Sequence, residues 1–135
     1  GDVLFTREAP AGEASIFEGN KKMCLGQRMM YFRPNQSRLN SIFLKFWIYS
    51  DVGCGYISSL SGGSTVTHLR VGQILNFPVV AIPINEQNAI ATYLNRETAK
   101  IDKLVELIET AIARLQEYRT TLVTAAVTGK IDVRN

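Results

Sequence analysis

The sequence predicts an α+β fold, in which a small mixed α/β domain over residues 1–82 is followed by one long C-terminal coiled-coil helix within residues 83–135. Two observations predict this division. Before Pro83, short apolar runs alternate with glycine-containing turns, whereas residues 86–128 contain neither glycine nor proline and consist largely of strong helix formers. The apolar residues of that second stretch also recur every seven positions, which is the period of a coiled coil.

Turn residues and apolar alternation define the elements expected in the first domain. Ala11-Gly12 and Gly19-Asn20 are typical of turns, and the run Ile42–Tyr49 is apolar nearly all round, as in a buried helix that Gly53 would end. In chain order we expect strands at Asp2–Thr6, Ala14–Phe17 and Gln27–Arg33, a buried helix from Asn40 or Ser41 to about Ser50, a helical turn at Tyr56–Leu60, a short helix at Leu69–Leu75 capped by Thr67, and a strand at Phe77–Ile82.

The long helix is expected to begin at the N-cap Asn85 and to end at Gly129. It would span roughly 60 Å at 1.5 Å per residue, so a small domain cannot cover its whole apolar stripe. We therefore expect a second helix to pair with it, the alternative being a helix that folds back on its own domain. The residues expected at the pairing seam are Leu94, Ile101, Leu104, Ile108, Ala111, Leu115, Tyr118 and Leu122.

The net charge of +3 lies wholly in the first domain. Residues 1–80 carry eight Lys and Arg against five Asp and Glu, whereas residues 81–135 carry seven of each sign. A basic excess favours polyanionic partners. No apolar run is long enough for a membrane helix, and no signal peptide is visible, so we expect a cytoplasmic protein without a membrane partner.

The residues that carry chemistry are sparse. Cys24 and Cys54 lack metal-ligand spacing, and His68 is the only histidine. The sequence contains no phosphate-binding loop, no adenine-methyltransferase motif and no cluster of carboxylates for a nuclease. We therefore expect a chain that is not a catalyst and that binds neither a metal nor a cofactor.

Four stretches resemble conserved motifs of one family, the DNA specificity subunits of type I restriction-modification systems. The last of them is the most specific. The stretches are Ile82-Pro83-Ile84-Asn85-Glu86-Gln87, Thr98-Ala99-Lys100-Ile101-Asp102, Leu115-Gln116-Glu117-Tyr118-Arg119 and Ala126-Val127-Thr128-Gly129-Lys130-Ile131-Asp132-Val133-Arg134. Residues 1–82 then resemble the later part of a target-recognition domain, with Gly63-Ser64 near its end.

The resemblance implies a sequence-specific reader of double-stranded DNA. Such a subunit carries two target-recognition domains, each followed by a long helix, and the two helices pair antiparallel as a ruler between half-sites. Methyltransferase subunits dock on it and methylate adenine with S-adenosylmethionine, which is expected on the partner, and a restriction subunit can join. Since the chain starts at Gly1 and has one helix, we expect a half-subunit that forms a homodimer, or a fragment that pairs with a second conserved helix.

Lys and Arg contact phosphates, and Arg also reads base edges, so basic residues of the first domain are the candidates for DNA contact. The loop around Gly63 is added because glycine lets a backbone approach closely. The candidates are Arg7, Lys21, Lys22, Arg28, Arg33, Arg38, Gly63 and Ser64, with Lys21-Lys22 preferred. Each of them is alternatively a solvated surface residue.

Two other functions remain open. One is a coiled-coil assembly module without a DNA-reading role. The other is a small enzyme that uses Cys24 or Cys54 with His68, although nothing in their spacing favours it. Glu86 and Gln87 have two interpretations as well, either docking or the ordinary needs of a helix N-terminus.

Overall fold

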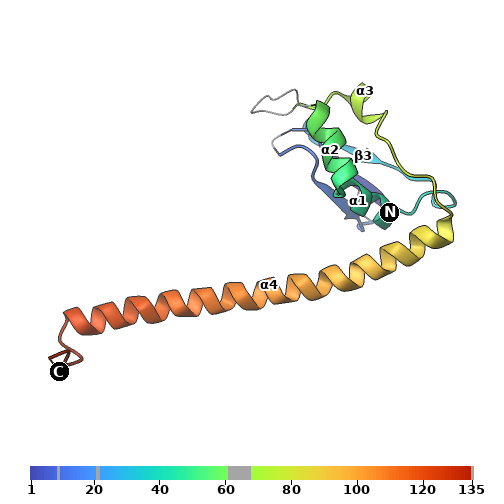
Figure 1. The fold of residues 1–135 in the computed structure, drawn as a ribbon. Helices are drawn as coiled ribbons and strands as arrows, with labels where there is room; N and C mark the ends of the chain where they lie inside the picture. The colour runs from blue at the N-terminus through green and yellow to red at the C-terminus, as the bar shows by residue number, and fades with distance from the viewer. Residues whose placement is uncertain (9, 21, 61–67, 135) are drawn as a thin grey trace. The chain divides into compact units, whose positions relative to one another are not determined.

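The computed structural model describes residues 1–8, 10–20, 22–60 and 68–134. It divides into two compact units, Gly1–Leu94 and Asn95–Asn135, each of which is described by itself. Figure 1 shows the elements in chain order. The α+β class and the long C-terminal helix are confirmed.

A three-stranded antiparallel sheet is the centre of the first unit. Strand β1 (Asp2–Thr6) lies between β2 (Ala14–Phe17) and β3 (Met29–Phe32), in the order β2-β1-β3. Val3 faces Ile16 on one side and Phe32 on the other, which fixes the register. The first two strands have the predicted bounds, whereas the third is shorter than the predicted Gln27–Arg33.

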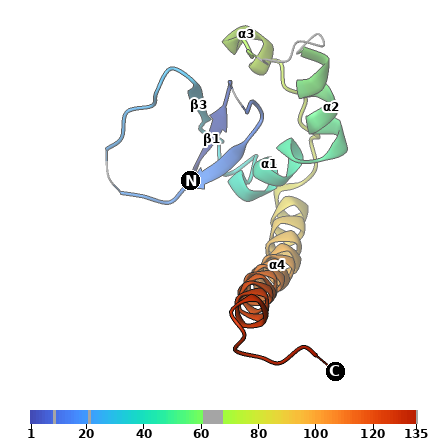
Figure 2. The same cartoon turned by 90° about the vertical axis from the view of Figure 1, so that its left-hand side faces the viewer.

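The core lies on one face of this sheet because side chains alternate along each strand. Val3 and Phe5 of β1 are buried, and they pack with Leu44 and Ile48 of helix α1 (Ser41–Ile48). Figure 2 shows α1 and the following helix α2 (Asp51–Leu60) on that side of the sheet. Asn40 caps α1 as expected, because its side-chain oxygen accepts a hydrogen bond from the Phe43 amide at 2.9 Å.

The prediction that Gly53 ends the first helix was wrong. The helix ends at Ile48, and Gly53 lies buried in the first turn of α2, against the end of α1. A Cβ atom at this position would lie closer to the carbonyl oxygens of Trp47 and Ile48 than real Cβ atoms do. The glycine therefore permits a close approach of two helices rather than a break in the chain.

The segment before the long helix also differs from the prediction. Helix α3 (Val71–Ile74) is shorter than the predicted Leu69–Leu75, and Thr67, its predicted cap, lies outside the described residues. No strand forms at the predicted Phe77–Ile82. Pro78 has no N–H to donate to a sheet, and side chains hold the segment instead: Trp47 Nε1 donates to the Pro78 carbonyl at 2.7 Å, and the Phe77 ring packs edge-on against Tyr56.

The long helix α4 (Ile84–Val127) starts before Asn85, its predicted N-cap. The Pro83 carbonyl accepts the amides of Glu86 and Gln87, and the turns up to Leu94 belong to the first unit. The predicted end is confirmed: Gly129 has a positive φ of 69°, and the Lys130 amide donates back to the Ala125 carbonyl at 2.8 Å. Among the described helices, none combines the length and apolarity that a membrane span requires.

Candidate nucleic-acid interface

The sheet face opposite the core carries a mixed apolar and charged surface. Asp2 and Leu4 of β1 alternate with the core residues Val3 and Phe5, and the register brings Phe17 opposite Asp2 and Tyr31 opposite Leu4. We call this surface the outer face and define it by Asp2, Leu4, Phe17, Tyr31 and Arg33.

The chain between β2 and β3 faces the outer face across a hollow of about 300 Å³. Lys22, Met23 and Leu25 line the hollow together with the outer-face residues. Figure 2 shows residues 18–20 and 22–28 on the side of the sheet away from α1 and α2. The Met23 and Tyr31 side chains are 61% and 46% exposed, and such apolar exposure is typical of a binding surface.

Arg33 follows β3 and is held in place from two sides. Its Nε and Nη2 donate to the two carboxylate oxygens of Asp2, at 2.9 and 2.7 Å, and its guanidinium carbon lies 5.2 Å from the centroid of the Tyr31 ring. The hydrogen bonds from Arg33 hold the pKa of the Asp2 carboxyl below its ordinary value of 3.8, and they raise the pKa of Arg33 in turn. The pair is therefore fully ionised at neutral pH.

Aromatic, aliphatic and cationic side chains on one open surface are suited to a polyanion with flat, partly apolar faces. Lys22 supplies an ammonium group, Tyr31 a ring, and Met23 and Leu25 supply apolar contact area. Within the described residues, no group of three or more His, Cys, Asp or Glu is placed to hold a metal ion.

A comparison with known protein families indicates the role of the chain. Residues 1–117 match the family model of the type I restriction modification DNA specificity domain. The chain belongs to this family. The predicted resemblance is thereby confirmed, and the chain has a role in DNA sequence recognition in type I restriction-modification.

In this DNA specificity domain, only part of the predicted contact set lies at the outer face. Lys22 and Arg33 line the hollow. Arg38 lies elsewhere, before α1, where its backbone carbonyl accepts a hydrogen bond from Gln87. Lys21, Gly63 and Ser64 lie outside the described residues.

Arg7 and Arg28 lie beyond the last pair of the β1–β3 ladder, near Glu8. Arg28 is 3.8 Å from the Glu8 carboxylate, and the Arg7 side chain donates to the Gln27 carbonyl. His68 Nδ1 contacts the same carboxylate at 2.6 Å, which gives the histidine a structural partner. Cys24 and Cys54 are free thiols, and Cys54 Sγ contacts the Ile48 carbonyl.

Three residues that line the hollow, Tyr31, Met23 and Leu25, are absent from the candidates predicted from the sequence, because those were mainly charged groups. One signal was available for Tyr31: it alternates with Met30 and Phe32, which pack on the core, so a strand must turn this ring outward. No comparable signal exists for Met23 and Leu25, which lie in a loop.

Of the two motif residues at the start of α4, Gln87 has a structural role. Its side chain is 1% exposed, its Nε2 donates to the carbonyls of Arg38 and Ile82, and its Oε1 accepts the Asn40 amide, all at 2.9 Å. Glu86 is exposed. Gln87 thus joins the start of α4 to the chain that leads into α1.

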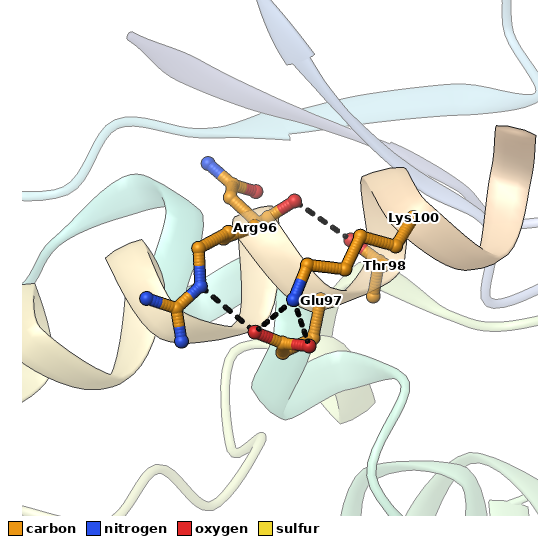
Figure 3. Close-up of polar contacts among 5 residues, drawn as sticks. Arg96, Glu97, Thr98 and Lys100 are labelled. Carbon is orange, nitrogen blue, oxygen red and sulfur yellow. Dashed lines mark hydrogen bonds and ion pairs between the residues drawn. The ribbon is translucent and has the colours of Figure 1, made fainter.

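The predicted seam residues from Ile101 to Leu122 belong to the second unit and lie on the helix surface, whereas Leu94 belongs to the first unit and is half-buried. Most of their side chains are about half exposed or more, from 46% at Leu122 to 67% at Leu115. Glu97 occupies a seam position near the start, and Figure 3 shows Arg96 and Lys100 converging on its carboxylate, at 2.8 and 2.9 Å. The hydrogen bonds from Lys100 and then Arg96 lower the pKa of Glu97, so it stays charged and the uninterrupted apolar seam starts at Ile101.

Proposed function

We propose that this chain is a reading subunit, or half of one, that binds double-stranded DNA through the outer face and residues 22–25. The observation that carries the proposal is the hollow that Lys22, Tyr31 and Arg33 line on the sheet face opposite the core. The major groove of DNA is about 12 Å wide and admits a two-stranded β-ribbon, and Lys22 is suited to the adjoining phosphates. The family match supports DNA as the ligand, and the geometry of the hollow supports this surface as the place of contact.

We further propose that the second unit pairs with another helix of its kind, either in a homodimer or with a second conserved helix. Inside this unit, only the tail after Val127 accompanies the helix, so nothing of its own covers the apolar seam. Each buried Leu or Ile gains roughly 1.5–3 kcal/mol over exposure, which favours pairing. Pairing would hold two reading domains a fixed distance apart.

Methylation and cleavage would then belong to partner subunits. We propose that methyltransferase subunits, with S-adenosylmethionine bound to them, dock on this chain and methylate adenine at the target, and that a restriction subunit joins the complex. The assembly would act in the cytoplasm. Co-purification of a methyltransferase subunit from the native host would support this part of the proposal, and a chain that purifies alone at native expression would contradict it.

A salt titration of DNA binding tests the reading function. The full chain should bind duplex DNA with an affinity that falls linearly on a logarithmic salt scale, and Lys22→Ala should reduce the slope by about 1 unit. Lys103→Ala, which removes an exposed lysine from α4, is the matched control and should leave the slope unchanged. A chain without salt-dependent DNA binding would instead be the assembly module, and identical slopes for the wild type and Lys22→Ala would exclude Lys22 as a phosphate contact.

A further inference from the structure

The hydrogen bonds of Arg33 leave one edge of its guanidinium available. An arginine has five N–H donors in a rigid planar fork. The Nε–H and one Nη2–H face the Asp2 carboxylate. Among the described residues, none accepts a hydrogen bond from Nη1, so the edge formed by Nη1 and the second Nη2–H is left to a ligand.

This edge is held in a fixed orientation. Asp2 lies opposite Arg33 across the β1–β3 pair and binds its fork with both oxygens, while Tyr31, two residues back on the same strand face, presents its ring to the guanidinium. A side chain that is already oriented loses less conformational freedom when it binds. Arg33 therefore presents two parallel N–H groups in one direction, although its side chain is 72% exposed.

The charge of the pair indicates what the edge binds. A phosphate would be repelled by the Asp2 carboxylate beside it, whereas a neutral acceptor pair would not. In the major groove, guanine offers two acceptors side by side, O6 and N7, and a bidentate arginine is their commonest partner. Lys22, across the same hollow, has no ion-pair partner among the described residues and is suited to a neighbouring phosphate.

We propose that Arg33 reads one guanine of the DNA target through N7 and O6 in the major groove, with Asp2 as its positioning residue. The inference rests on the proposed DNA-reading function and adds the base and the residue that selects it. The competing interpretation is that the Asp2–Arg33 pair only ties β1 to β3, in which case base choice does not depend on either side chain.

Selection of binding sites from a randomised duplex pool distinguishes the two. The wild-type chain should enrich a motif with a guanine at one position. Arg33→Ala and Asp2→Asn should lose the preference at that position while they keep the rest of the motif. Arg70→Ala, which removes an exposed arginine outside the hollow, is the matched control and should retain the guanine. A motif without a guanine, or the same guanine selected by Arg33→Ala, would overturn the inference.

A change in the DNA provides a second test that does not depend on the folding of any variant. Replacement of the selected guanine by 7-deazaguanine removes the N7 acceptor and should weaken wild-type binding about tenfold. Arg33→Ala should bind both duplexes about equally. An unchanged wild-type affinity would show that the arginine does not read N7. If the wild-type chain enriches no motif at all, the reading function itself fails, and a motif insensitive to Arg33 removes the guanine contact alone.

Discussion

At the scale of single residues, Gln87 is the position with the strictest hydrogen-bonding requirement. A buried amide is tolerated only when its donors and acceptor are satisfied, and Gln87 satisfies all of them with backbone groups of Arg38, Asn40 and Ile82. Asn40 is itself the N-cap of α1. One side chain therefore connects the starts of two helices that lie far apart in the sequence.

Gln87→Leu should destabilise the first unit by about 3 kcal/mol, because the apolar side chain leaves two carbonyls and one amide without partners in the interior. Urea unfolding should show a lower midpoint at an unchanged slope. The exposed neighbour Asn85→Leu is the control and should stay within about 0.5 kcal/mol of the wild type. Equal stability of Gln87→Leu and wild type would mean that the amide is not a structural clamp.

At the scale of elements, the apolar seam of α4 distinguishes pairing from a solitary helix. Ile108→Asp should reduce the molar mass measured by light scattering to that of a monomer, because pairing would bury an uncompensated charge. Ala113→Asp introduces the same charge on the opposite face of the same helix and should leave the mass unchanged. A monomeric wild type, or a dimer that survives Ile108→Asp, would contradict pairing through this seam.

The elements that the sequence predicted correctly are those decided by local chemistry. Alternation places Val3 and Phe5 on one face of β1, and a glycine at position 129 supplies the left-handed turn that ends α4. The errors concern long-range contacts. Gly53 is explained by the carbonyls of α1 that it touches, and the segment around Pro78 is held by Trp47, a residue more than thirty positions away.

The difference between local chemistry and long-range contacts also explains how much of the candidate site could be predicted. Basic residues could be chosen from composition, but only the strand register shows that Arg33 faces Asp2 and Tyr31 while Arg38 lies elsewhere. The role of Gln87 was equally inaccessible, since its three partners come from two segments that the sequence does not bring together.

At the scale of the whole molecule, the two units differ in what stabilises them. The first has its own core around Val3, Phe5, Leu44 and Ile48. The second is a helix with a short tail and has no interior of its own among the described residues. If pairing covers its seam, its stability must depend on protein concentration, as it does for any associating species.

Thermal unfolding followed by circular dichroism should therefore show two transitions. The one that belongs to α4 should shift to higher temperature over a hundredfold rise in protein concentration, while the transition of the first unit should not move. In Ile108→Asp the shift should vanish, and Ala113→Asp should keep it. A single transition that is independent of concentration would argue for a helix covered by its own chain.

The alternation along β1 and β3 also bears on how such a domain diversifies. Val3, Phe5, Met30 and Phe32 face the helices, while the intervening side chains face the open side. If the outer face reads DNA as proposed, substitutions at every second position alter what this face selects without disturbing the packing beneath it. One scaffold of this kind can acquire new target preferences by drift at a few outward positions, and its stability need not decline as it does so.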